Sequence, residues 1–156
     1  MTKERKPVRP ESSTPRLQDT VRLSATGLAK VLGDLESRVL RTVWALRNPA
    51  SARVVHEAIE PHHPVSSLTT ITVLNKLVRK GILAREKQDD LFHYRALLTE
   101  PEFMAHASRR VVEGILSFGP DAVASSFVEL LAEQDPQKLA ELGRLIRRKL
   151  RDSRSE

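Results

Sequence analysis

Residues 67–83 read SLTTITVLNKLVRKGIL, and this stretch decides the fold. Apolar side chains recur there at three- and four-residue spacing, which predicts an amphipathic helix ending at Lys80. Ser66 or Ser67 can cap its first turn, and Gly81 can follow its last, since glycine adopts a positive φ without steric cost. At about 100° per residue, one arc of the helix is expected to be buried: Thr70, Ile71, Leu74, Leu77 and Val78.

The opposite arc of this helix carries hydroxyls, cations and one apolar side chain. Threonine is a poor helix former on an exposed surface, so its repetition there suggests a role other than helix stability. Short side chains near a helix start can contact base edges in a major groove, and longer cations can contact phosphates. The alternative is an ordinary amphipathic helix with a solvated face. The candidate DNA contacts of this helix are Ser66, Ser67, Leu68, Thr69, Thr72, Asn75, Lys76 and Arg79.

Two short helices are predicted before this one. The first begins near Asp34, which we assign as its N-cap, and ends before Pro49. The second begins after Ser51, another N-cap, and ends at Pro61.

A hairpin is predicted after the third helix, with strands at 82–87 and 91–97 joined by a turn at 88–90. Lys87 and His93 are its candidate DNA contacts. Three short helices followed by a hairpin match the order of a winged helix-turn-helix. The expected fold is therefore mainly α with a small β-hairpin wing.

The pattern after Pro101 is wholly helical, with segments at 101–117, 121–133 and from Asp135 onward. Three short helices have little core of their own, so their apolar faces are expected to pack on a second copy of the chain. We therefore predict a homodimer. Its candidate contacts are Val123, Phe127, Leu130, Leu131, Leu139, Leu142 and Ile146.

The expected domain organisation has four parts. Residues 1–30 are basic and proline-containing, and we expect a disordered tail. The winged domain is expected at 31–100, the helical dimerisation domain at 101–150, and a disordered end at 151–156.

Charge is distributed unevenly along the chain, whose net charge is +6. The first hundred residues are net basic, whereas residues 101–143 are net acidic. This division suggests that the first part meets a polyanion and the second does something else. The alternative is that the charged tails only keep the protein in solution.

Several function classes are disfavoured. The chain has no cysteine, which excludes disulfides, thiolate metal sites and cysteine nucleophiles. His56, His62 and His63 lack a further ligand at a recognised spacing, so we predict no metal. No catalytic motif is present, so we expect no enzyme, no cofactor and no evident small-molecule ligand. No apolar run has membrane-spanning length and no signal segment begins the chain, which favours the cytoplasm.

Four parts of the chain resemble the penicillinase-repressor family (BlaI/MecI/CopY) and follow one another in the family's order. They are the stretch from Leu32 to Trp44, the run 68–83, Tyr94, and the F-V-E at 127–129. The likeness covers about residues 31–150. It implies a homodimeric repressor on a near-palindromic operator in double-stranded DNA, controlling resistance or cell-envelope genes.

The resemblance also implies release from DNA by proteolysis in the dimerisation region, triggered by a membrane sensor metallopeptidase. Carried over to this sequence, the scissile bond joins Ser126 and Phe127. Ser126 departs from the family's usual asparagine, and Asp89-Asp90 departs from the Gly-Arg of the family's wing tip. We therefore expect the wing to contribute little to DNA binding. Copper sensing through C-terminal cysteines is excluded.

Two other functions remain open. One is a winged-helix module that docks on another protein, and the other is a nonspecific DNA-binding protein. Binding through several phosphates gives a steep salt dependence, which a protein-docking module lacks.

Overall fold

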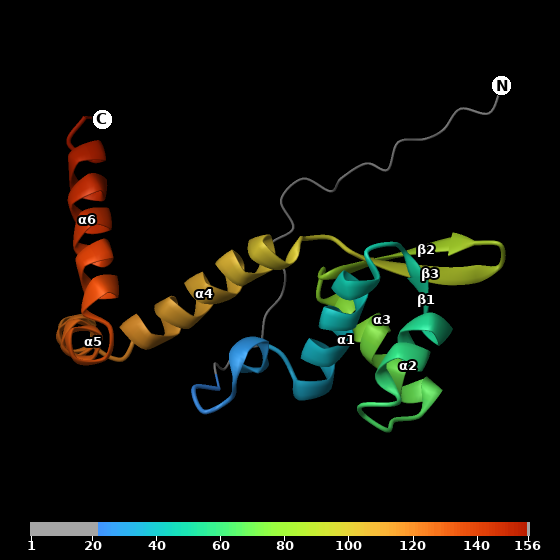
Figure 1. Cartoon of the computed structure of the whole chain (residues 1–156). Helices are drawn as coiled ribbons and strands as arrows, with labels where there is room; N and C mark the ends of the chain where they lie inside the picture. The colour runs from blue at the N-terminus through green and yellow to red at the C-terminus, as the bar shows by residue number, and fades with distance from the viewer. Residues whose placement is uncertain (1–21, 156) are drawn as a thin grey trace. The chain divides into compact units, whose positions relative to one another are not determined.

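The computed structural model describes residues 22–155 and divides the chain into two compact units, the first ending at Val111 and the second beginning at Val112. Its helices and strands are labelled in Figure 1. In chain order they are the 3-10 helix η1 (Gly27–Lys30), α1 (Asp34–Leu46), β1 (Ala50–Ser51), α2 (Ala52–Ile59), α3 (Ser67–Arg79), β2 (Leu83–Gln88), β3 (Leu91–Ala96), α4 (Glu100–Leu116), α5 (Pro120–Gln134) and α6 (Pro136–Asp152).

The first unit is a winged helix-turn-helix, as its sequence predicts. Helices α1, α2 and α3 pack against one another, and β2 and β3 form a ribbon that projects beyond them (Figure 1). The two strands pair antiparallel from Leu83↔Ala96 to Gln88↔Leu91. Asp89 and Asp90 make the turn with φ of 46° and 64°. Two positive φ values suit the right-handed twist of a two-residue hairpin.

A third strand was not predicted. β1 pairs antiparallel with β3, so β3 lies in the centre of the sheet. A strand of two residues is too short to show the alternation of apolar and polar side chains that predicts a strand. Its pairing with β3, with Ala50 opposite Tyr94, is what identifies it.

The start of the first unit differs from expectation. Residues 22–30, expected within a disordered tail, carry η1, and Leu28 is only 2% exposed in the core. Arg22 holds this segment, donating to the carbonyl of Ala29 and pairing with Asp34 at 3.0 Å. One buried leucine in a polar stretch gives no periodic signal, which explains the wrong prediction. The rest of the expected tail, residues 1–21, lies outside the described residues.

The end of the first unit also differs. Phe103 and Ala107 of α4, assigned to the dimerisation domain, are buried in the core of the first unit. The Phe103 ring packs edge-on against Trp44, with ring centroids 5.7 Å apart. The first turns of α4 therefore complete the winged domain.

The second unit consists of the end of α4, α5 and α6, as the helical pattern predicts, and α6 continues to Asp152 where a disordered end was expected. Helices α5 and α6 contact each other. Neither helix has a buried residue.

Within residues 22–155, no single helix has the length and apolarity to cross a membrane. α4 and α5 meet these criteria only as a pair, with a sharp bend between them.

Candidate nucleic-acid interface

Ser66 shapes the start of α3. It is the N-cap residue, and its hydroxyl accepts from the Thr69 N–H at 3.1 Å and lies 2.8 Å from the Thr69 hydroxyl. At the other end, Gly81 follows the helix with φ of 71°. The predicted bounds of α3 are confirmed. Ser66 serves the helix itself, whereas the side chain of its neighbour Ser67 is exposed.

The exposed face of α3 lies where the sequence predicts it. Leu68 is 70% exposed, and Thr69, Thr72 and Arg79 are exposed as well. The Thr72 hydroxyl donates to the Leu68 carbonyl at 2.9 Å, so its oxygen can still accept a hydrogen bond. An aliphatic side chain, two threonine methyls and two hydroxyls thus form one surface, which we call the α3 face (Leu68, Thr69, Thr72 and Arg79).

The buried face of α3 is narrower than expected. Thr70, Leu74 and Leu77 are fully buried, whereas Ile71 is 37% exposed and Val78 is half-buried. Ile71 therefore borders the α3 face and widens its apolar part.

Lys76 was predicted as a DNA contact, but in the structure it forms an ion pair within the protein. Its Nζ is 2.8 Å from Glu36 Oε1, and Lys80 Nζ is 2.8 Å from Glu36 Oε2. The Glu36 side chain is 4% exposed, and its Oε2 also accepts from the Gly33 N–H at 3.0 Å. Glu36 therefore caps α1, with Gly33 rather than Asp34 at the N-cap, and ties α1 to α3.

The same contacts decide the charge of Glu36. Burial alone would raise its pKa, but hydrogen bonds from Lys76, Lys80 and the Gly33 N–H outweigh burial and lower the pKa from 4.5 to about 2. The carboxylate is ionised at neutral pH and partly neutralises Lys76. Arg79 has no ion-pair partner among the residues described, so it is the more available cation on α3.

Asn75, a predicted DNA contact, instead links α3 to the hairpin. Its side-chain oxygen accepts from Tyr94 Oη at 3.1 Å and from an Arg85 guanidinium nitrogen at 3.0 Å. Tyr94 is 2% exposed. These bonds fix the position of the hairpin against α3, a role that helical spacing alone cannot reveal.

The two predicted contacts on the hairpin differ from each other. Lys87 is exposed and lies 3.3 Å from the Asp90 carboxylate. His93 is only half-exposed because the unpredicted β1 pairs beside it at Ser51, and its Nδ1 is buried without a hydrogen-bond partner among the described residues. Lys87 can reach a phosphate, whereas His93 faces protein.

The histidines in and after α2 do not form a metal-binding cluster in the described part of the chain. His56 Nδ1 lies 3.1 Å from the Thr70 hydroxyl, which links α2 to α3. Within the described part of the chain, no group of three His, Asp or Glu side chains is placed to hold a metal ion.

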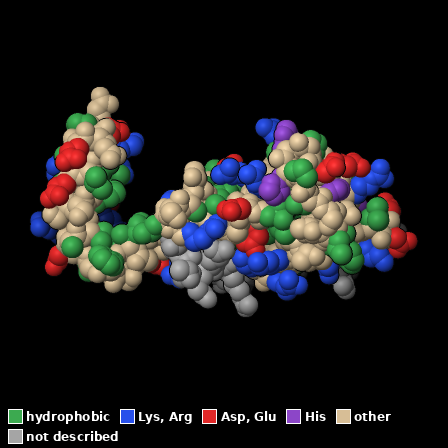
Figure 2. All heavy atoms as spheres, turned by 90° about the horizontal axis from the view of Figure 1, so that it is seen from below, with side chains coloured by type: hydrophobic (Ala, Val, Ile, Leu, Met, Phe, Trp, Pro, Cys, Tyr) green, Lys and Arg blue, Asp and Glu red, His purple; other side chains and the backbone are tan. Residues whose placement is uncertain are grey.

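The predicted dimer contacts are accessible in the second unit. The side chains of Phe127, Leu130 and Ile146 are 52%, 52% and 50% exposed. The other predicted contacts are partly buried: Val123, Leu131, Leu139 and Leu142. Figure 2 shows apolar side chains at the surface of these helices. Ser126, at the predicted scissile bond, is exposed within α5.

Sequence comparisons bear on this arrangement. The transcriptional regulator BlaI of Mycobacterium tuberculosis is 31% identical over 74 residues, which cover 47% of this chain and 54% of that protein. The chain thus spans about half the length of this curated relative. The methicillin resistance regulatory protein MecI of Mammaliicoccus sciuri is 26% identical over 98 residues, covering 63% of this chain and 79% of that protein.

A solved structure titled for the DNA recognition and protein interaction domains of HOP2 aligns with 39% of this chain, at 20% identity and a TM-score of 0.37. That likeness is too weak to carry an argument.

The family model described as penicillinase repressor matches residues 32–148. This match begins just before α1 and ends within α6, so it takes in the α3 face, the hairpin, α4, α5 and most of α6. The chain belongs to the penicillinase repressor family.

Proposed function

We propose that this protein is a transcriptional repressor that binds duplex DNA through the α3 face and acts as a homodimer. The observation that carries the proposal is the exposure of Leu68, Thr69 and Thr72 on one side of a helix whose other side is buried. Threonine methyls and a leucine can cover thymine methyl groups, and the hydroxyls can bond to base edges. Arg79 and Lys87 are exposed cations that can contact phosphates.

The relatives named above support a regulatory role. One is named a transcriptional regulator and the other a methicillin resistance regulatory protein. We propose by this kinship that the genes controlled here serve resistance or the cell envelope.

Selection from a pool of random duplex DNA tests the proposal. We expect the chain to enrich two inverted half-sites whose centres lie about one helical turn, or a multiple of it, apart. Binding should weaken steeply with salt, with a log–log slope near −0.9 for each phosphate neutralised. Enrichment of no sequence despite steep salt dependence would indicate nonspecific binding, and absence of DNA binding would favour a protein-docking module.

Threonine variants test which face contacts the bases. Thr69→Ala and Thr72→Ala should each reduce the preference for the selected site over random DNA by about 1–3 kcal/mol. Thr42→Ala is the matched control, because the Thr42 hydroxyl makes the same bond to a carbonyl four residues back, at 3.0 Å, but lies on α1. Equal losses on selected and random DNA would place base contacts elsewhere.

We also propose that proteolysis between Ser126 and Phe127 ends repression. Both residues are exposed, but the bond between them lies inside α5. The helix must therefore unfold locally before a peptidase can bind this segment in an extended conformation. Incubation with the cognate membrane metallopeptidase should release a fragment ending at Ser126, measured by mass spectrometry. An intact chain after full turnover of a control substrate would exclude this site.

A further inference from the structure

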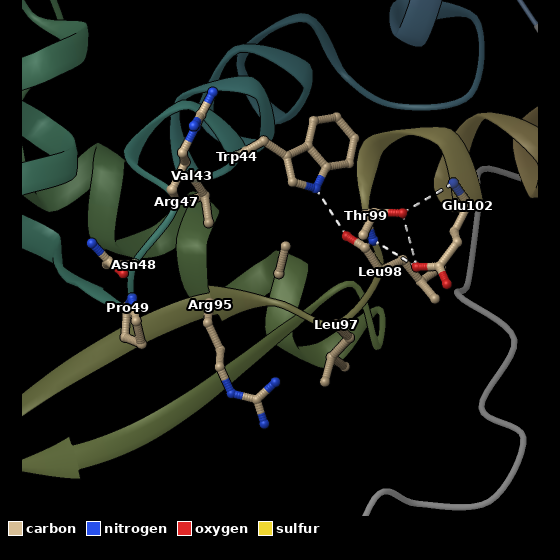
Figure 3. Close-up of a pocket in the computed structure, with 11 residues that line it drawn as sticks. Val43, Trp44, Arg47, Asn48, Pro49, Arg95, Leu97, Leu98, Thr99 and Glu102 are labelled. Atoms are coloured by element: carbon tan, nitrogen blue, oxygen red, sulfur yellow. Dashed lines mark hydrogen bonds between the residues drawn. The ribbon is translucent and has the colours of Figure 1, made fainter.

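The first unit contains a hollow of about 440 Å³, remote in sequence from the α3 face. The end of α1, the end of β3 and the first turn of α4 surround it (Figure 3). Small-molecule sites in proteins commonly have volumes of about 300–1,000 Å³. The hollow is therefore large enough for a molecule the size of a bicyclic aromatic acid.

The surface of this hollow is amphipathic. Its apolar part comes from side chains on α1, on the loop after it and on the segment that follows β3: Val43, Trp44, Pro49, Ala96, Leu97 and Leu98. Two arginines, Arg47 and Arg95, lie on either side of it (Figure 3). Such a surface suits a ligand with an apolar body and a charged end.

The charges favour an anion. Arg47 is exposed and has no ion-pair partner within residues 22–155, whereas Arg95 is shared with Glu86 at 3.1 Å. The one carboxylate in the lining, Glu102, accepts from the Thr99 N–H at 2.8 Å and from the Thr99 hydroxyl at 3.0 Å. Its Oε2 is thus engaged at the start of α4, and Arg47 is the cation of the lining that pairs with no carboxylate among residues 22–155.

The backbone of Arg47 supports a role for its side chain. It follows α1 with φ of 60°, in the left-handed region where glycine is favoured. An arginine at this position is strained, and strained residues that persist are often found at ligand sites. Asp89 and Asp90, the two other non-glycine residues of positive φ in the described chain, make the hairpin turn, whereas Arg47 makes the left-handed end of α1.

We propose that this hollow binds a small aromatic carboxylate, with the carboxylate on Arg47 and the ring beside Trp44. The Trp44 indole N–H donates to the Leu98 carbonyl at 2.9 Å (Figure 3). A bound ring therefore touches the segment that joins β3 to α4. The proposal concerns ligand binding alone and does not depend on DNA binding.

The indole of Trp44 provides a direct measurement, since the chain has one tryptophan. In a ¹⁵N-labelled full chain, its indole N–H gives a single NMR cross-peak. We expect millimolar 1-naphthoate to shift this peak saturably. The neutral 1-naphthalenemethanol and the cationic 1-naphthylmethylamine should shift it far less. An unmoved peak, or equal binding of the neutral compound, would overturn the proposal.

Variants of Arg47 separate ligand binding from folding. Arg47→Gly should weaken naphthoate binding about tenfold or more, because a charged hydrogen bond is lost. The same change relieves a strained φ, so the melting temperature should stay or rise. Arg47→Lys keeps the charge and should retain most of the affinity. Arg144→Ala removes an exposed cation on α6 and should bind as the wild type does. Wild-type affinity of Arg47→Gly would overturn the proposal.

Discussion

At the scale of the residue, Glu36 holds an ionised carboxylate inside the first unit, with Lys76, Lys80 and the Gly33 N–H around it. We expect Glu36→Gln to lower the free energy of unfolding by about 2–3 kcal/mol at pH 7, because two lysines lose their shared partner. Urea denaturation measures this difference. A loss below about 0.5 kcal/mol would show that the lysines find solvent at no cost.

The pH dependence identifies the charge as the source. The pKa of Glu36 is about 2 in the folded chain against an ordinary 4.5, so its contribution is complete above pH 4.5 and is lost as the pH falls through 2. The stability difference between wild type and Glu36→Gln should therefore shrink from pH 5 to pH 3. An unchanged difference at pH 3 would attribute it to packing.

The two cations on the outer side of α3 should also differ. Arg79→Ala should reduce the salt slope of DNA binding by about one and leave stability within about 0.5 kcal/mol, since Arg79 is exposed. Lys76→Ala should lower stability as well, because it uncovers Glu36. Fluorescence anisotropy at several salt concentrations, with thermal unfolding alongside, compares the two variants. A larger slope change for Lys76→Ala would show that the lysine leaves Glu36 for phosphate.

At the scale of the element, the hairpin uses aspartates where glycine or asparagine is preferred. Asp90 has φ of 64° and makes one exposed contact, 3.3 Å from Lys87. We expect Asp90→Gly to raise the free energy of unfolding by a few tenths to about 1 kcal/mol, because the steric cost of positive φ exceeds a weak surface ion pair. Thermal unfolding checks this. Asparagine tolerates positive φ less well than glycine, so the stability of Asp90→Asn should lie between that of the wild type and that of Asp90→Gly.

At the scale of the whole molecule, α5 and α6 leave apolar side chains at their surface. We expect Ile146→Glu to convert a dimer into monomers, since a carboxylate in an apolar interface is costly and Ile146 is half-exposed in the single chain. Sedimentation equilibrium measures the association. Arg148→Glu places the same carboxylate on the opposite side of α6 and should remain dimeric. A dimeric Ile146→Glu chain with wild-type affinity would move the interface elsewhere.

The sequence alone determined the elements that depend on local order. The spacing of apolar residues predicted α1 to α6 and separated the buried side of α3 from the α3 face. Ser51 predicted the start of α2, and Gly81 predicted the end of α3. Each of these signals lies within a few residues of the structure that it predicts. Local backbone geometry is fixed by such neighbours, which is why the predictions are confirmed.

Only the tertiary structure decided which distant residues meet. Glu36 and Lys80 are 44 residues apart, and Trp44 and Leu98 are 54 apart. Glu36 also pairs with Lys76 and so partly neutralises one predicted DNA contact. The Trp44–Leu98 contact forms one wall of the hollow beside Arg47. The burial of Leu28 and Phe103 likewise depends on a core that neither segment forms by itself. Spacing along a chain carries no information on such encounters, because side chains from separate elements come together only when those elements pack.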